Sequence, residues 1–63
     1  MNYSKAIKEL RKKLLVSQTE LAEMLGVSFQ TVNRWETEKY EPTIKAKRKL
    51  KKLFEENSIT LED

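Results

Sequence analysis

The chain contains no cysteine and no histidine, and its 63 residues include a single glycine and a single proline. Without cysteine or histidine, disulfide bridges are excluded, and so are the thiolate and imidazole ligands of the usual metal sites. No apolar run approaches the roughly 20 residues of a membrane-spanning helix, and the first residues lack the apolar core of a secretory signal peptide. The sequence therefore predicts a soluble cytoplasmic protein with no membrane contact, no metal and no cofactor.

The same absences leave few ways to build an active site. Nucleophilic or general-base catalysis needs a reactive side chain with a proton acceptor held beside it. The carboxylates are scattered over positions expected to be exposed, and they suggest no such pair. We therefore expect the protein not to be an enzyme.

Charge is plentiful but unevenly distributed. Thirteen lysines and arginines outnumber ten acidic residues, which gives a net charge of +3. The basic residues crowd into two clusters, Lys5, Lys8, Arg11, Lys12 and Lys13, and then Lys45, Lys47, Arg48, Lys49, Lys51 and Lys52. Such clusters favour phosphate backbones or acidic surfaces, although lysines also simply keep exposed helix faces solvated.

The scarcity of glycine and proline and the abundance of leucine, lysine, glutamate and alanine favour helices joined by tight connections. The first helix is expected over residues 3–14, where four apolar side chains repeat at spacings of four, three and four. These are Tyr3, Ile7, Leu10 and Leu14. A helix with one such stripe needs a partner surface that covers it.

A second helix is expected to begin after Ser17 and to end at Gly26. Ser17 and Glu20 have the spacing of a capping box, in which each side chain accepts from the backbone of the other residue. Gly26 ends the helix because glycine adopts the left-handed conformation without strain. The inward face should comprise Leu21, Ala22, Met24 and Leu25, followed by Val27 as a buried pivot.

Ser28 is the expected cap of a third helix, which runs from Phe29 to about Thr37. Val32 and Trp35 are three residues apart and should face inward, with the indole filling space against the first helix. The outward side of this helix is then polar.

A fourth helix should follow Pro42, because proline ends the preceding connection, and should run from about Thr43 to Glu56. Its inward stripe is predicted to be Ile44, Ala46, Leu50, Leu53 and Phe54. Ile59 and Leu61 offer a last apolar patch, which is compatible with one turn of a fifth helix.

Residues 17–36, SQTELAEMLGVSFQTVNRWE, resemble the helix-turn-helix of the phage repressor and Cro family, also called the XRE type. The similarity lies in a glutamine at the start of the first motif helix, in Leu-Gly-Val-Ser at the turn, and in Trp-Glu at the end of the second. It extends from Leu10 to Phe54, nearly the whole chain. The resemblance implies an all-α, compact, lambda-repressor-like domain of four to five helices, a single domain over residues 1–63 with its motif at about 18–37.

The resemblance also implies a function. In this family the second motif helix lies in the major groove of double-stranded DNA, while the helix before it crosses the backbone. We therefore expect sequence-specific DNA binding, most simply by a transcriptional regulator. An antitoxin that represses its own operon, or the DNA-targeting module of a larger protein, is an alternative in which a protein partner is also expected. A protein-interaction domain without DNA binding is a remoter alternative, since such a module more often exposes an apolar groove.

The resemblance places base-reading side chains on the outward side of the second motif helix. They are Gln30, Asn33 and Arg34, with Ser28, Phe29 and Thr31 at the groove entrance. Glutamine and asparagine pair bidentately with adenine, arginine pairs with guanine, and phenylalanine can touch a thymine methyl. The backbone-contacting positions are Gln18, Thr37, Lys39 and Thr43. In an unassigned bundle the same polar side would be ordinary solvated surface, and an aromatic at position 29 can instead pack on the turn.

Structural roles follow from the resemblance as well. Arg11 and Glu36 should form a partly buried ion pair that ties the first helix to the end of the recognition helix. Removing one partner of such a pair costs about 3–5 kcal/mol if the other charge stays buried. Both residues are therefore expected to support the fold.

Departures from the family pattern bear on conformation and assembly. Leu15 and Glu38 stand where relatives often have glycine, which leaves the conformation of both connections open. In the fourth helix, Lys47, Arg48 and Lys51 replace positions that are commonly apolar or small. Where relatives bury this surface or use it to form dimers, the present chain is charged. The sequence thus allows a monomer, a homodimer on DNA through another face, or a fourth helix that contacts an anionic partner.

Overall fold

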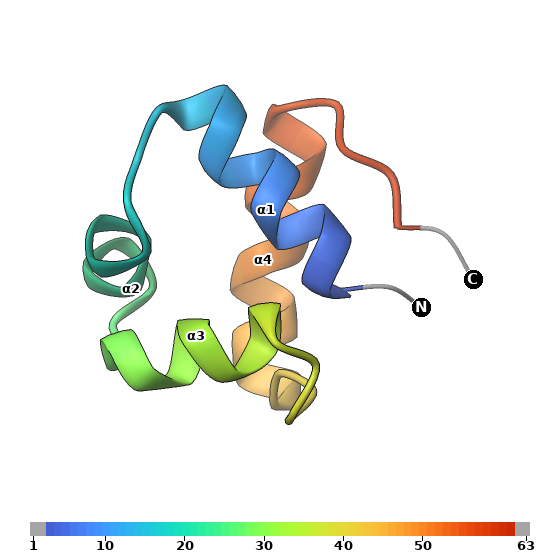
Figure 1. Ribbon diagram of the computed structural model, residues 1–63. Helices are drawn as coiled ribbons and strands as arrows, with labels where there is room; N and C mark the ends of the chain where they lie inside the picture. The colour runs from blue at the N-terminus through green and yellow to red at the C-terminus, as the bar shows by residue number, and fades with distance from the viewer. Residues whose placement is uncertain (1–2, 62–63) are drawn as a thin grey trace.

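The computed structural model describes residues 3–61, and this part of the chain consists of four helices and no strand. They are α1 (Tyr3–Leu14), α2 (Gln18–Leu25), α3 (Phe29–Glu36) and α4 (Ile44–Glu56) (Figure 1). The all-α prediction is confirmed. No helix in the described range is both long and apolar enough to span a membrane.

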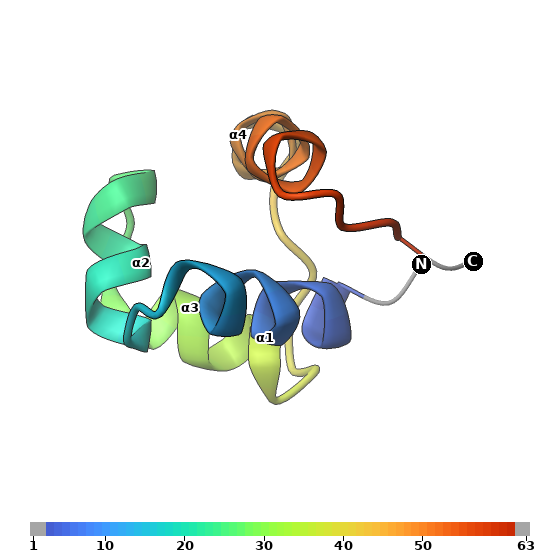
Figure 2. The same ribbon diagram turned by 90° about the horizontal axis from the view of Figure 1, so that it is seen from above.

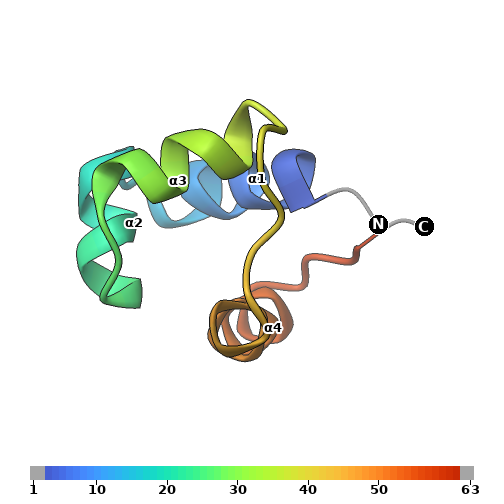
Figure 3. The same cartoon turned by 90° about the horizontal axis from the view of Figure 1, so that it is seen from below.

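The helices enclose one core between them. α3 packs on α1 and α2, and α4 packs on the other sides of α1 and α2. α1 lies over α3 with the opposite chain direction, and α4 crosses them, so that it is seen along its axis from above and from below (Figures 2 and 3). The second motif helix is therefore supported from behind by α1 and keeps its other side outward.

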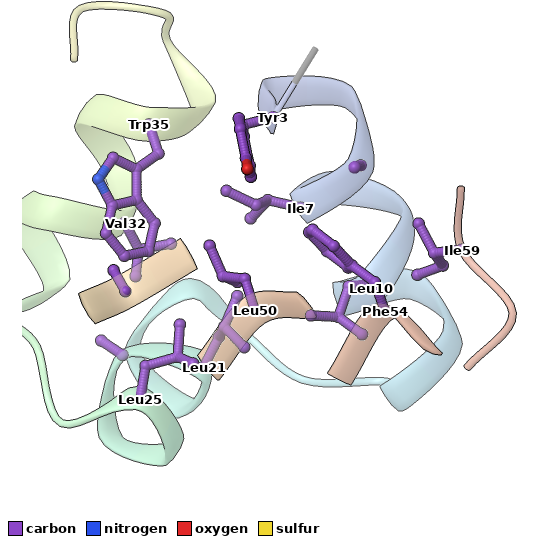
Figure 4. Packing of buried hydrophobic residues seen from close by; sticks show 13 residues of the cluster. Tyr3, Ile7, Leu10, Leu21, Leu25, Val32, Trp35, Leu50, Phe54 and Ile59 are labelled. Carbon is purple, nitrogen blue, oxygen red and sulfur yellow. The ribbon is translucent and has the colours of Figure 1, made fainter. Parts of the chain in front are cut away.

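Figure 4 shows the apolar side chains that fill this core. Val32 and Trp35 of α3 are buried, as predicted from their spacing. The tilted rings of Tyr3 and Phe54, whose centroids lie 6.5 Å apart, join α1 to α4. The complete cluster is Tyr3, Ala6, Ile7, Leu10, Leu21, Ala22, Leu25, Val32, Trp35, Ala46, Leu50, Phe54 and Ile59.

Three of the helices begin at a hydroxyl side chain. Ser17, Ser28 and Thr43 have extended backbone conformations, and each side chain accepts from the backbone N–H three residues later. At Ser17 the predicted capping box is present, because the carboxylate of Glu20 also accepts from the backbone N–H of Ser17 at 2.9 Å. These caps satisfy N–H groups that a helix leaves without an internal partner.

All four helices end in the same way, with a residue in the left-handed conformation. These residues are Leu15 (φ 58°), Gly26 (φ 71°), Glu38 (φ 63°) and Ser58 (φ 56°). The next N–H in each case donates to a carbonyl five residues earlier, at 2.8–3.1 Å, as in a Schellman motif. The sequence left open the conformation of the connections at Leu15 and Glu38. Both residues adopt the left-handed conformation that favours glycine.

For two residues, the prediction that the side chain points inward is wrong. Met24 is 51% exposed and Ile44 is 70% exposed. At about 100° per residue, Met24 lies on the flank of the arc formed by the buried side chains of α2, and Ile44 lies about 120° around α4 from Leu50. Apolar character alone assigned them inward, whereas helical geometry turns them outward.

The end of the chain also differs from expectation. Residues 59–61 form no fifth helix. The N–H of Ile59 donates to the carbonyl of Phe54 at 2.8 Å, and this turn folds Ile59 into the core, where it is 7% exposed. Val27, predicted as a buried pivot, is only half-buried and packs at the edge of the core.

Candidate nucleic-acid interface

The outward side of α3 is a short polar surface. Val32 and Trp35 fix the opposite side in the core, so Gln30, Asn33 and Arg34 all extend into solvent. In the view from below, α3 lies in front of α1 with nothing in front of it (Figure 3). The three predicted base readers therefore share one accessible helix surface.

The start of α3 uses its hydroxyl groups to hold the helix. The Ser28 side chain accepts from the backbone N–H of Thr31 at 3.1 Å, and the hydroxyl groups of the two residues lie 2.8 Å apart. Phe29 is 48% exposed, so its ring packs only partly on the turn. Ser28 thus acts as a cap in the free protein, while the ring at position 29 stays accessible.

A buried carboxylate ties this surface to α1 and α2. Arg11 Nε donates to Glu36 Oε2 at 2.6 Å and Arg11 Nη2 donates to Oε1 at 2.8 Å, which makes a bidentate pair. The Glu36 side chain is 4% exposed and that of Arg11 is 26% exposed. In addition, the Ser4 hydroxyl donates to the Glu36 carbonyl at 2.6 Å. The end of α3 is therefore fixed against α1 by both its backbone and its side chain.

Gln18 belongs to the same network. Its Nε2 donates to Glu36 Oε1 at 3.0 Å, so the carboxylate fixes which way the amide group points. An amide nitrogen carries two hydrogens, and the second one remains for a further acceptor such as a phosphate. Gln18, at the start of α2, is thereby linked to the end of α3.

The network shifts the titration of both partners. Burial alone would raise the pKa of the Glu36 carboxyl, but hydrogen bonds from Arg11 and Gln18 and the positive charges of Arg11 and Lys8 outweigh it, so the pKa is lowered. The hydrogen bond to Glu36 raises the pKa of Arg11 despite the opposing effect of burial. The pair therefore stays ionised near neutral pH.

The loop after α3 carries the remaining predicted contacts. The Thr37 hydroxyl donates to the carbonyl of Asn33 at 2.9 Å, Lys39 is exposed, and Thr43 caps α4. Glu41 lies in the same loop but pairs with Lys47 at 3.2 Å. That ion pair offsets part of the negative charge that this loop would bring toward a phosphate.

A hollow of about 210 Å³ separates α3 from this loop. Its lining brings together three of the predicted site residues, Thr31, Arg34 and Thr43. It also includes Tyr40, which the sequence prediction missed, and Arg34 places its guanidinium carbon 5.4 Å from the centroid of that ring. The only sequence signal for Tyr40 is an aromatic residue in a polar loop, since its position beside Arg34 depends on the path of the loop.

Several residues of the basic clusters hold the fold together. Lys49 Nζ donates to the carbonyl of Leu25 at the end of α2, at 2.9 Å, and Lys13 Nζ donates to the carbonyl of Asn57 at the end of α4, at 2.8 Å. Lys47 pairs with Glu41 and lies over the ring of Tyr3, 5.3 Å from its centroid. Fewer of the lysines in α4 are therefore available to a partner than their number in the sequence indicates.

Residues 3–61 bring together no group of three acidic, histidine or cysteine side chains suited to holding a metal ion.

The model of the helix-turn-helix family, Cro/C1 type, matches residues 7–54, which is 48 of the 63 residues. Neither a curated protein nor a solved structure matches the chain. The matched segment contains the outward polar side of α3, the side chains of Arg11, Gln18 and Glu36 that support it, and the loop to α4.

Proposed function

The chain belongs to the Cro/C1-type helix-turn-helix family of DNA-binding domains, and we propose that it binds double-stranded DNA sequence-specifically, as a transcriptional regulator. The observation that carries this proposal is the outward side of α3, where the amides of Gln30 and Asn33 and the guanidinium of Arg34 are all exposed. Their hydrogen-bonding groups match those at base edges in the major groove. A regulator of this kind acts by occupying its site and so blocking or recruiting other proteins.

In the proposed complex, α3 lies in the major groove. Gln30 and Asn33 pair with adenines, Arg34 pairs with a guanine, and Phe29 contacts a thymine methyl near the helix start. The bidentate pair between Arg11 and Glu36 keeps α3 rigid on α1, so that little conformational freedom is lost when the helix docks. Contacts to base edges would then supply the sequence preference.

Phosphate contacts would fix the register of α3. Gln18 has its amide oriented by Glu36, with a second N–H for a phosphate oxygen. Thr37 and Lys39 follow α3 directly, and Thr43 begins α4, whose first N–H groups have no partner within the helix. Helix N-termini are favourable positions for phosphate. These contacts would position the protein without reading sequence.

Selection from a pool of random duplexes tests the proposal directly. We expect enrichment of a short preferred site, and we expect binding to that site to weaken steeply as salt rises, because cations near the phosphates are released. A pool of single-stranded DNA and RNA of the same length is the matched control. Binding without enrichment of any sequence would refute specific recognition, and absence of binding to every pool would refute the nucleic-acid function itself.

A further inference from the structure

The loop residue Tyr40 lies against the recognition side chain Arg34. The guanidinium carbon is 5.4 Å from the ring centroid, within the range of a cation–π contact. Tyr40 is 62% exposed, so little of its ring contributes to the core. A tyrosine this exposed gains little from burial, and its neighbour is one of the three outward polar residues of α3.

The backbone holds Tyr40 in this place. Glu38 adopts a left-handed conformation and the N–H of Lys39 donates to the carbonyl of Arg34 at 3.0 Å, so the chain reverses direction directly after α3. On the other side of Tyr40, Pro42 is buried, and Glu41 is tied to Lys47 on α4 at 3.2 Å. The backbone at position 40 is thus held beside the helix, next to Arg34.

The geometry of a guanidinium determines what the contact with the ring does. An aromatic ring occupies one face of the planar group, whereas the five N–H donors lie in the plane and stay available at its edge. A free arginine side chain samples many rotamers, which it must give up on binding. The contact with Tyr40 removes part of that freedom before DNA arrives, and a ring against one face of the guanidinium leaves its in-plane donors available.

We propose that Tyr40 is a positioning residue that holds Arg34 for bidentate recognition of a guanine, so that this pair sets the preference for one G·C base pair at the C-terminal end of α3. The proposal rests on the proposed DNA-binding function. It adds to the pairing of Arg34 with guanine the loop residue through which that reading becomes selective. Guanine fits because its O6 and N7 both accept in the major groove, side by side.

The experiment compares Tyr40→Leu, Tyr40→Phe and Arg34→Ala with the unmodified chain. Each is titrated with the preferred duplex and with duplexes in which single G·C pairs are replaced by A·T. Arg34→Ala identifies the base pair concerned, as the one at which discrimination is lost. We expect Tyr40→Leu to reduce discrimination at that same pair by about two- to fivefold, as the loss of an exposed cation–π contact implies, and Tyr40→Phe to retain it.

A double mutant and a spectroscopic measurement separate positioning from other roles. Adding Tyr40→Leu to Arg34→Ala should change discrimination at that base pair no further, because the ring then has nothing to hold. In the free protein, the ring current of Tyr40 should shift the Arg34 side-chain proton resonances, and Tyr40→Leu should abolish the shift. Thermal unfolding of each variant verifies that the fold is intact.

Each failure has its own meaning. If a preferred site exists and Arg34 reads a base pair, but Tyr40→Leu discriminates as well as the unmodified chain, the inference is wrong while the proposed function stands. Equal losses on all sequences for Tyr40→Leu and Tyr40→Phe would instead make the hydroxyl a phosphate contact and would also overturn it. Preference for A·T at the base pair assigned to Arg34 refutes the guanine assignment. Absence of any preferred site sinks the proposed function.

Discussion

Individual side chains on the surface proposed to face DNA should differ in whether they read bases or only contact the DNA backbone. Arg34 is a candidate base reader on α3, whereas Lys39 lies in the loop and carries a flexible point charge. We expect Arg34→Ala to cost about 1–3 kcal/mol on the preferred site and to relax specificity at one or two base pairs. Binding isotherms on the selected duplex and on its single-base variants measure both effects.

Lys39→Ala is the matched control for that prediction. Loss of a phosphate contact weakens binding to all sequences alike and reduces the magnitude of the slope of log K against log salt by about 1. The assignment of Arg34 as a base reader would be contradicted if Arg34→Ala also weakened specific and random duplexes equally. Titrations at several salt concentrations distinguish the two outcomes.

Leu15 stores backbone strain at the end of α1. Its φ is 58° and its side chain is 87% exposed, so the strained residue gains little from packing. A left-handed residue with a Cβ costs about 1–2 kcal/mol. Glycine removes this strain, but it lowers the free energy of unfolding by about 0.5–1 kcal/mol because its unfolded state is more flexible. We therefore expect Leu15→Gly to raise the free energy of unfolding by up to about 1.5 kcal/mol, measured by urea denaturation.

Glu9→Gly provides the contrast, because Glu9 is exposed in the middle of α1, where the backbone is helical. There glycine should lower the free energy of unfolding by about 1 kcal/mol. If Leu15→Gly destabilised the protein to the same extent, the left-handed conformation at position 15 would not be a source of strain.

Residue by residue, the sequence predicted burial correctly where helical spacing supported it and wrongly where apolar character was the sole basis. Val32 and Trp35 are buried as their spacing predicted, because they are the apolar residues on one side of a helix whose other side is polar. Met24 and Ile44 were placed inward on apolar character alone, and the helical rotation puts them in solvent. The contact of Arg34 with Tyr40 was beyond prediction, because it depends on the left-handed conformation of Glu38, which a residue other than glycine rarely adopts.

At the scale of the helices, the capping box specifies where α2 begins. Ser17 Oγ accepts from the N–H of Glu20 at 3.1 Å, and the Glu20 carboxylate accepts from the N–H of Ser17 at 2.9 Å. We expect Ser17→Ala to lower the free energy of unfolding by about 0.5–2 kcal/mol, the usual cost of losing a side-chain cap. Thr19→Ala, at an exposed position in the same first turn, should have almost no effect or stabilise slightly. Equal losses in urea denaturation would show that the cap is energetically unimportant.

The link between α1 and α3 should make the fold sensitive to acid. The pKa of Glu36 is lowered in the folded protein relative to the usual glutamate value near 4.3. Stability from this carboxylate is therefore fully present above the unfolded pKa, and it is lost as the pH falls through the lowered folded pKa. The raised pKa of Arg11 has no effect in this range, because the guanidinium stays charged throughout.

Glu36→Gln isolates this contribution from that of the other carboxylates. At pH 7 we expect a loss of about 1.5–3 kcal/mol, the range for hydrogen bonds to charged groups, since Arg11 stays partly solvated. The difference from the unmodified protein should shrink steadily below about pH 4.5. Unfolding curves recorded from pH 7 to pH 3 check this, and a difference that stayed constant over that range would contradict it.

Helix boundaries were predictable where a local signal exists. Ser17 and Ser28 marked two starts correctly, because a hydroxyl that accepts from the third following N–H is a property of four consecutive residues. Pro42 placed the start of α4 to within one residue, whereas the cap at Thr43 was not predicted. The turn of a fifth helix that the sequence allowed is not formed by residues 59–61, since apolar character at Ile59 is explained equally by an extended segment that closes the core. Local pattern there did not decide between a helix and a turn.

For the molecule as a whole, size and charge bear on assembly. The principal extents are 24 × 23 × 19 Å. Two copies whose recognition helices enter the major groove one helical turn apart are separated by about 34 Å, so their folded cores would meet only along their edges. The solvent side of α4 carries exposed Lys45, Arg48 and Lys52, and two such surfaces would repel each other. Neither property favours a stable interface between free copies.

We therefore predict that the protein is monomeric in the absence of DNA and that two copies bind a symmetric site together. A stable interface usually buries about 800 Å² on each partner, which edge contact between domains of this size does not provide. Sedimentation velocity at tens of micromolar protein should give the mass of one chain, and the selected duplex, if palindromic, should bind two chains. A duplex with the half-sites moved half a helical turn apart is the control, because it places the second copy on the opposite side of the DNA and should abolish any cooperativity. A stable dimer without DNA would contradict the prediction and would indicate an interface on another face, since the charge along α4 opposes one there.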